Sequence, residues 1–179
     1  MSSLRVFISI NFDNYIKNKI YDCMQKLKQC ATRGNFTRRE NLHLTLVFIG
    51  ETFNINALKK AMDTVCVSTF DININGFGCF HRDEGDIFWI GVEKNAVLNT
   101  IYNNFYSALK TEGFILETRE FKPHVSLGRR VSLYDNFDIN AFAKTIQPIC
   151  MIVENISLMK SERVNSCLTY TEIYNKQLI

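Results

Sequence analysis

The chain has 179 residues, of which 46% are hydrophobic and 22% charged, and its formal net charge at pH 7 is +3. This composition is typical of a folded globular protein and excludes a disordered polar chain, and so small a net charge does not by itself indicate nucleic-acid binding. No segment has the roughly 18 consecutive apolar residues of a membrane span, and the first apolar run is too short for a secretory signal. We therefore expect a cytoplasmic, monomeric protein without membrane contact, whose six cysteines stay reduced.

The first part of the chain alternates between the periodicities of strands and helices. Apolar residues at every second position indicate strands, and apolar residues three and four positions apart indicate helices. Asn54 is the expected N-cap of the second helix because its side chain can accept from a free backbone N–H. In order, the expected elements are a strand at 4–10, a helix at 16–30, a strand at 42–49, a helix at 55–66 and a strand at 70–80.

The same alternation continues in the second part of the chain. Gly113 is expected to end a third helix, and Pro148 a short fourth one, because neither residue continues a helix well. The expected elements are a strand at 87–92, a helix at 98–109, a strand at 121–129, a short helix at 139–146 and strands at 149–159 and 168–173.

The order of these elements contains a repeat. Strand, helix, histidine-bearing strand, helix and strand occur once up to about residue 80 and again from about residue 87 to 159. We expect one α+β domain spanning 1–179, with two lobes at roughly 1–80 and 87–160 that arise from an internal duplication and are related by a pseudo-twofold axis around a central cleft. Each lobe would be an antiparallel or mixed sheet backed by helices, and the C-terminal strands would close the fold. A doubly wound parallel sheet is disfavoured because no Gly-rich phosphate loop joins a strand to a helix.

Two of the three histidines lie in matching contexts. Residues 42–46 read Leu-His-Leu-Thr-Leu, and residues 123–127 read Pro-His-Val-Ser-Leu. Side chains alternate along a strand, so each motif places an imidazole and a hydroxyl on one face, about 6–7 Å apart, with apolar residues behind them. A lone histidine on a strand is usually structural, but the matched pair in two corresponding positions favours a functional role.

Paired imidazoles and hydroxyls suit the cleavage of a P–O bond. One group must take a proton from the nucleophile and another must give one to the leaving oxygen, and imidazole does both near neutral pH because its ordinary pKa is about 6.5. The hydroxyls can donate hydrogen bonds to phosphoryl oxygens, where charge builds in the transition state. A cyclic phosphate is strained, so such a site can work without a metal or cofactor, and we expect neither.

The motifs give the chain a resemblance to the two-histidine (2H) phosphoesterase superfamily, and within it to the RNA 2′,3′-cyclic phosphodiesterases, also called 2′-5′ RNA ligases. Two H-x-[ST]-x motifs about 80 residues apart carry it. The similarity extends over nearly the whole chain, in the segments 5–8, 41–50, 88–91, 121–129 and 158–162 and at Tyr170.

This resemblance implies hydrolysis of a 2′,3′-cyclic phosphate at an RNA end to a 2′-phosphomonoester, with 2′-5′ joining as a weaker reverse activity. It implies that His43 donates a proton to the leaving 3′-oxygen, that His124 accepts one from water, and that Thr45 and Ser126 bind the phosphate. The sequence departs from the family in having Ser126 and Gly128 where Thr and Ala are common. The residues alone leave open which imidazole is the acid, because the two motifs are nearly equivalent.

An arginine after the second motif is a further phosphate-binding candidate. The resemblance selects Arg129, whereas strict strand alternation points Arg130 into the groove, and a β-bulge would reverse the alternation. His81 has Asp83 rather than a hydroxyl two residues on, and a zinc site made of the three histidines lacks any short-range ligand pair. Phe36 or Phe80 could stack on a nucleobase.

Three functions fit the pattern. The first acts on the cyclic-phosphate ends of RNA, the second on small cyclic nucleotides or 2′-5′ oligoadenylates, and the third binds RNA ends without turnover. Expected partners are therefore RNA ends or small nucleotides that carry a 2′,3′-cyclic phosphate.

Overall fold

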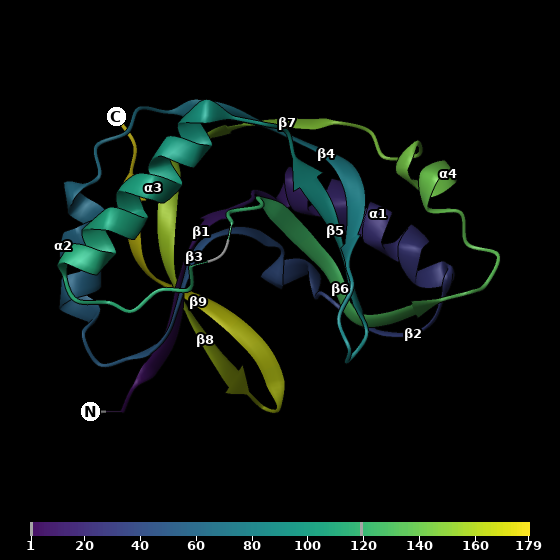
Figure 1. Cartoon of the computed structure of the whole chain (residues 1–179), viewed down its shortest axis with the longest axis horizontal. Coiled ribbons are helices and arrows are strands. Elements are labelled where there is room, and N and C mark those ends of the chain that lie inside the picture. The colour runs from purple at the N-terminus through teal and green to yellow at the C-terminus, as the bar shows by residue number, and fades with distance from the viewer. Residues whose placement is uncertain (1, 119) are drawn as a thin grey trace.

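The computed structural model describes residues 2–118 and 120–179 and folds them into two antiparallel sheets with four α-helices. In spatial order, the first sheet consists of β3 (His43–Thr52), β1 (Leu4–Asn11), β8 (Asn155–Val164) and β9 (Cys167–Gln177). The second sheet consists of β2 (Ala31–Phe36), β6 (His124–Leu133), β5 (Asp86–Val92), β4 (Phe70–Phe80) and β7 (Ile149–Val153). The α+β class with two sheets and helices is confirmed, and Figure 1 shows the arrangement.

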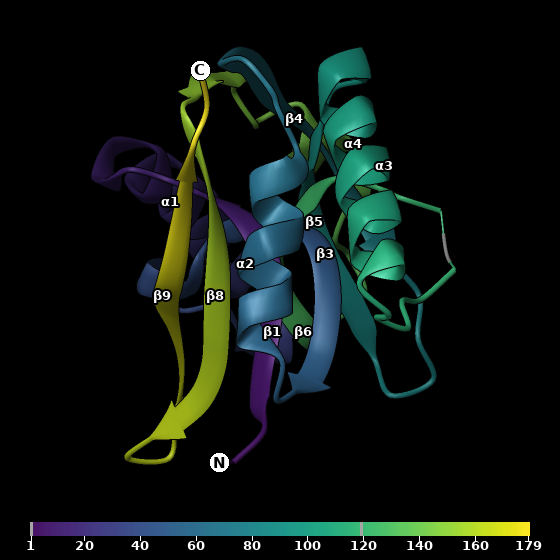
Figure 2. The ribbon, with the colours of Figure 1, turned by 90° about the vertical axis from the view of Figure 1, so that its left-hand side faces the viewer.

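The helices begin where polar side chains cap them. The helices are α1 (Asn14–Gln29), α2 (Ile55–Thr64), α3 (Ala96–Thr111) and α4 (Ile139–Ala143), with a 3₁₀ turn η1 at Arg39–Asn41. The side chains of Asp13, Asn54 and Asn95 accept hydrogen bonds from the first turns of α1, α2 and α3. Gly113 follows α3 with φ +86°, a conformation that suits glycine and ends the helix. Helices α2 and α3 lie side by side in Figures 1 and 2, and the β8–β9 hairpin projects away from the body.

Two expectations about the strands were wrong, and one strand was missed. The expected strand 149–159 is two strands, because β7 pairs with β4 in the second sheet whereas β8 pairs with β1 in the first. The chain crosses between the sheets near Glu154, and an apolar stretch does not reveal such a crossing. Strand β2, which is mostly exposed and polar, was not expected at all, and β6 begins at His124 rather than at 121.

Sheet membership does not follow the two halves of the sequence. Strands β2 and β4 come from residues 1–80 but lie in the second sheet, and β8 comes from the later half but lies in the first. Neither the segment 1–80 nor the segment 87–160 therefore forms a sheet on its own. The exchange of strands ties both halves into one structure, and the origin by duplication stays a prediction.

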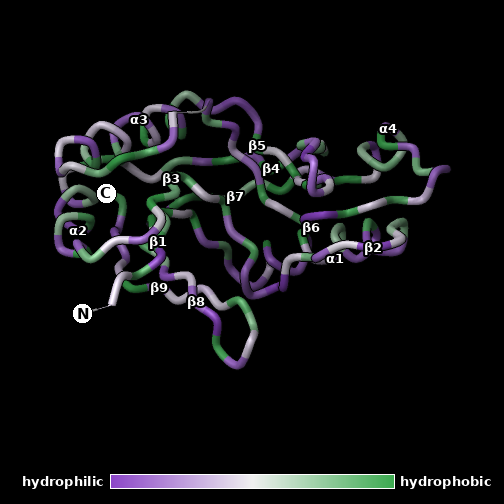
Figure 3. Tube along the Cα trace, turned by 60° about the horizontal axis from the view of Figure 1, so that its bottom comes forward, coloured by the Kyte–Doolittle hydropathy of each residue, from purple (hydrophilic) through white to green (hydrophobic). Residues whose placement is uncertain are grey.

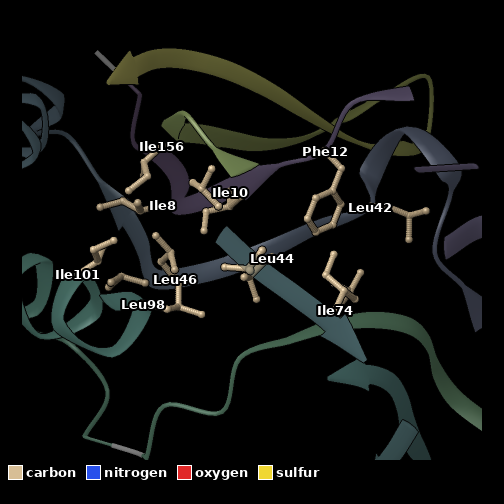
Figure 4. Packing of buried hydrophobic residues seen from close by; sticks show 14 of the residues in the cluster. Ile8, Ile10, Phe12, Leu42, Leu44, Leu46, Ile74, Leu98, Ile101 and Ile156 are labelled. Carbon is tan, nitrogen blue, oxygen red and sulfur yellow. The ribbon is translucent and has the colours of Figure 1, made fainter. Parts of the chain in front are cut away.

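The apolar face of β3 anchors the first histidine motif. Leu44 and Leu46 of β3 are buried, as is Leu42 directly before the strand, and Figure 4 shows Leu46 beside Leu98 and Ile101 of α3. Their burial leaves the alternate residues His43 and Thr45 on the opposite face. Val125 and Leu127 are likewise buried behind the second motif.

Hydrophilic and hydrophobic residues alternate along much of the chain, whereas β7 is hydrophobic throughout (Figure 3). Among the described residues, no helix is both long enough and apolar enough to cross a membrane. All six cysteines are free thiols.

We predict that Leu44→Ala lowers the free energy of unfolding by about 2–5 kcal/mol, because it leaves a cavity in a fully buried part of the core. Urea denaturation measures the change. The matched control is Phe53→Ala, at a side chain that is 71% exposed, where a change within about 0.5 kcal/mol is expected. Equal effects of the two substitutions would contradict the assigned packing.

Candidate active site

Both histidine motifs open onto one cavity. Its volume is about 690 Å³, and residues of both sheets form its walls. The first sheet contributes Arg5, Phe7, His43, Thr45 and Tyr170, and the second contributes His124, Ser126 and Arg129. Strands β3 and β6 each begin at their histidine, so the two motifs occupy equivalent positions on the two walls.

The ring of His43 is fixed by a backbone hydrogen bond and two aromatic neighbours. Its Nδ1 lies 2.7 Å from the carbonyl oxygen of Asn41. A carbonyl only accepts, so Nδ1 carries a hydrogen and Nε2 is the atom available for proton transfer. Phe7 lies 4.8 Å from the imidazole and Tyr170 packs edge-on at 5.2 Å, both measured between ring centroids.

His124 is held in the same way on the facing wall. Its Nδ1 donates to the carbonyl oxygen of Lys122 at 2.6 Å, again two residues back along the chain. Phe80 packs edge-on against its ring at 5.0 Å, and Trp89 lies 6.1 Å away between centroids. Gly78 allows Trp89 this position, because a Cβ at Gly78 would lie 2.3 Å from the indole ring. Each imidazole thus has the same tautomer and a pair of aromatic supports.

The motif hydroxyls also reach the cavity. Thr45 Oγ1 lies 2.8 Å from Nε2 of His43, so in the neutral ring the hydroxyl donates to the unprotonated nitrogen. Ser126 lines the same cavity, and its carbonyl accepts a hydrogen bond of 2.8 Å from the hydroxyl of Thr37. The structure therefore brings His43, Thr45, His124 and Ser126 together.

A β-bulge decides between the two arginines. Ser126 pairs with Trp89 and Gly128 with Phe88, so Leu127 is an extra residue that reverses the alternation of β6. Arg129 then lines the cavity, as the resemblance implied. Arg130 has φ +55° and pairs with Glu84 in the β4–β5 loop, so strict alternation misplaced it.

Burial makes His43 neutral before any ligand binds. The pKa of His43 is lowered to about 4, mainly by burial; the hydrogen bond to Asn41 acts in the opposite direction, and the nearby charges of Arg129 and His124 contribute to the lowering. A bound anion would offset both the desolvation and the positive charges. The cavity is therefore suited to a negatively charged ligand, which would favour protonation of His43.

A second cavity of about 420 Å³ adjoins the first and shares Thr45, His124 and Arg129 with it. Its other walls include four aromatic side chains and two basic ones: Phe80, Tyr102, Tyr106, Phe121, Arg82 and Lys122. Of the two candidates for base stacking, Phe80 lies here, whereas Phe36 lies close to Gly128 between β2 and β6.

Several wall residues were not predicted from the sequence. Arg5, Phe7 and Tyr170 lie far from either motif in the chain and reach the cavity only through strand pairing, and Phe7 and Tyr170 contact the His43 ring there. Their one signal was that they fall in segments that carry the family resemblance. His81 is not in either cavity and lies with Cys79 and Asp86 instead.

Comparisons with known proteins show the family to which the chain is similar. The family model of the 2′-5′ RNA ligase superfamily matches residues 18–165. A protein of Thermotoga maritima named RNA 2′,3′-cyclic phosphodiesterase is 26% identical over 180 residues, which cover 97% of this chain and 95% of that one. A protein of Aeropyrum pernix with the same name is 36% identical over 94 residues, or 50% of this chain and 53% of that one.

Solved structures share the fold. The Escherichia coli LigT complex with 3′-AMP superposes with a TM-score of 0.83 at 23% identity and covers 98% of both chains. The PDE domain of MHV ns2 superposes with a TM-score of 0.62 at 10% identity over 87% of this chain and 99% of that one.

We predict that, in the free protein, His43 stays neutral until the pH falls to about 4, because the unprotonated ring is the form that burial favours. NMR titration of the histidine ring resonances measures this. Sulfate, which does not itself titrate in this range, should raise the pKa of His43. An ordinary titration near pH 6.5 without sulfate, or no response to sulfate, would contradict the assignment.

Proposed function

The chain belongs to the 2′-5′ RNA ligase superfamily, and we propose that it hydrolyses the 2′,3′-cyclic phosphate ends of RNA to 2′-phosphomonoesters. The observation that carries the proposal is the pair of imidazoles that line one cavity from the two sheets, each with Nδ1 hydrogen-bonded to a backbone carbonyl so that Nε2 is the atom that exchanges a proton. The names of the curated relatives, RNA 2′,3′-cyclic phosphodiesterases, support the same substrate.

The reaction requires two proton transfers on opposite sides of phosphorus. His124 accepts a proton from water at Nε2 while the water oxygen bonds to phosphorus. The bond from phosphorus to the 3′-oxygen breaks, and His43 gives its Nε2 proton to that oxygen. The product has a 2′-phosphate and a 3′-hydroxyl, and exchange with solvent returns His124 to its neutral state. His43, left neutral, takes up a new proton when the next substrate binds.

The bound phosphate prepares His43 for its role as acid. In the free protein the ring is neutral and its Nε2 accepts from Thr45. The negative charge of the substrate favours the imidazolium, so His43 takes up a proton as the phosphate arrives. The Thr45 hydroxyl then turns to a phosphoryl oxygen, where it acts together with the hydroxyl of Ser126 and the guanidinium of Arg129.

An RNA end fits better than a phosphate alone because the walls extend beyond the reacting groups. The adjoining cavity offers aromatic surfaces, among them Phe80 beside His124, on which a nucleobase can stack. All groups used in these steps are side chains of the chain itself, so we propose a reaction without a metal. Joining of ends through a 2′-5′ linkage would be the same chemistry in reverse, with a ribose hydroxyl in place of water.

We predict that the protein rapidly converts an oligonucleotide 2′,3′-cyclic phosphate to the 2′-phosphate in the presence of EDTA. Chromatography of the reaction products measures the conversion. His43→Ala and His124→Ala should each lower kcat by about 10²–10⁴-fold, because each removes one proton transfer. The wild-type pH–rate profile should be bell-shaped, and each variant should lose a different limb.

The outcomes separate the competing functions. Turnover that needs added metal, or loss of the same limb in both variants, would contradict the mechanism. Turnover of 2′-5′ oligoadenylate alone would favour a different substrate, and binding of the RNA end without turnover would favour a non-catalytic binder.

The neighbouring arginines provide a matched pair. We predict that Arg129→Ala lowers kcat/KM by about 10-fold or more, since a charge-assisted hydrogen bond to phosphate is worth roughly 1.5–3 kcal/mol. Arg130→Ala should leave kcat/KM nearly unchanged, because its side chain pairs with Glu84 outside the cavity. Steady-state kinetics at fixed salt measure both. Similar losses of kcat/KM in the two variants would show that the bulge does not determine which arginine binds the phosphate.

A further inference from the structure

A group of three different metal-binding side chains lies on the β4–β5 hairpin, outside the machinery described above. Cys79 is near the end of β4, His81 follows that strand, and Asp86 begins β5. Their donor atoms all lie within 4.8 Å of one another. Within the described part of the chain, this is the one such group of three or more histidine, cysteine or acidic side chains.

Strand register explains why the three side chains meet. Phe80 pairs with Ile87 across the hairpin, which places Asp86 opposite His81. Cys79 and His81 are two residues apart and so share one face. Phe80, Arg82 and Ile87 face the other way and line the cavity beside His124, whereas Asp86 lines a separate hollow with Val131 and Tyr134. The group therefore lies on the face of the hairpin turned away from the reaction.

The donor separations already approach those of a metal site. Nδ1 of His81 lies 3.9 Å from Sγ of Cys79 and 3.2 Å from both carboxylate oxygens of Asp86. A tetrahedral zinc ion with bonds of about 2.3 Å to sulfur and about 2.1 Å to nitrogen or oxygen holds neighbouring donors about 3.4–3.6 Å apart. The two His81 separations differ from these values by a few tenths of an ångström, and the third pair, Sγ of Cys79 and the Asp86 carboxylate, lies within 4.8 Å. Closing that third separation onto one ion requires a side-chain movement of up to about 1 Å.

The charges around the hairpin favour a cation. Residues 81–86 hold three carboxylates and one arginine, and Arg130 pairs with one of the carboxylates, Glu84, so the three acidic groups face two arginines and the local balance is −1. Arg82 is directed to the cleft face, where its guanidinium lies 5.9 Å from the Phe80 ring centroid. A metal would replace the contacts of His81 with Asp86 and Cys79; the His81 side chain is 85% exposed, and contacts of so exposed a group contribute little to stability.

We propose that Cys79, His81 and Asp86 form a zinc-binding site, with water as the fourth ligand. Thiolate, imidazole and carboxylate together suit zinc, whereas Mg²⁺ and Ca²⁺ prefer oxygen ligands alone. Binding forms one bond from the metal to each of Sγ, Nδ1 and a carboxylate oxygen, and the thiol proton passes to solvent. The site is independent of the proposed hydrolysis, which uses no metal.

The bound metal would link the two strands next to a residue of the reaction site. Phe80 lies between two of the ligands in the sequence and packs against His124 on the opposite face. Zinc bound to its neighbours would restrict the hairpin from which that contact is made. The expected result is a rise in the melting temperature with zinc, because zinc binds the folded hairpin in preference to the unfolded chain.

Titration of the full-length, reduced protein with Co²⁺ tests the site directly, because tetrahedral Co²⁺ absorbs visible light and a cobalt–thiolate bond adds a charge-transfer band. We expect one Co²⁺ per chain with both signals, and displacement by one equivalent of Zn²⁺. Cys79→Ser, His81→Gln and Asp86→Asn should each weaken binding about a hundredfold or more, and Cys79→Ser should abolish the charge-transfer band.

Two controls exclude other sites on the chain. Cys150→Ser removes an exposed thiol of the neighbouring strand β7 and should leave binding intact. The double variant His43→Ala/His124→Ala removes both imidazoles of the cleft and should also retain the band. Circular dichroism establishes whether each variant is folded. If Cys79→Ser does not fold, His81→Gln, at a more exposed position, tests the site in its place.

The proposal is overturned if wild-type protein binds no Co²⁺ at micromolar protein, if the charge-transfer band survives in Cys79→Ser, or if either control abolishes it. Hydrolysis measured in EDTA reports on the proposed function separately. Loss of metal binding with intact hydrolysis would refute this site alone.

Discussion

The alternation of side chains along β3 and β6 is the constraint on which the site depends. Buried residues such as Leu44 and Val125 fix which face of each strand meets the core, so the histidines must face the cavity. A hydrogen bond from each Nδ1 to the carbonyl two residues earlier then sets the tautomer. A slip of one residue in either strand would bury an imidazole and expose a leucine or valine.

Local signals could be predicted from the sequence, whereas departures from regular pairing could not. Both motifs and most elements follow from short-range periodicity, and the polar strand β2 was missed because its pattern is not apolar. The choice of Arg129 over Arg130 depends on an extra residue at Leu127, which shows only in the strand register. Phe7 and Tyr170 support His43 from strands far away in the sequence, so no local pattern predicts them.

The protonation state of His43 depends on what the cavity holds. A cavity that keeps His43 neutral disfavours an isolated positive charge there and makes protonation conditional on an anion. Under the proposed function, the acid form would then arise mainly where substrate is bound. The two faces of the β4–β5 hairpin have different roles. Phe80 on one face packs against His124, and Cys79, His81 and Asp86 lie together on the other.

A crystal structure with a nucleoside 2′-phosphate tests most directly whether both imidazoles serve one phosphorus. The phosphate should lie between the walls, with Nε2 of His43 and Nε2 of His124 each about 2.7–3.2 Å from its oxygens. A phosphate that contacts only one of the two rings, or that binds outside this cavity, would contradict the account.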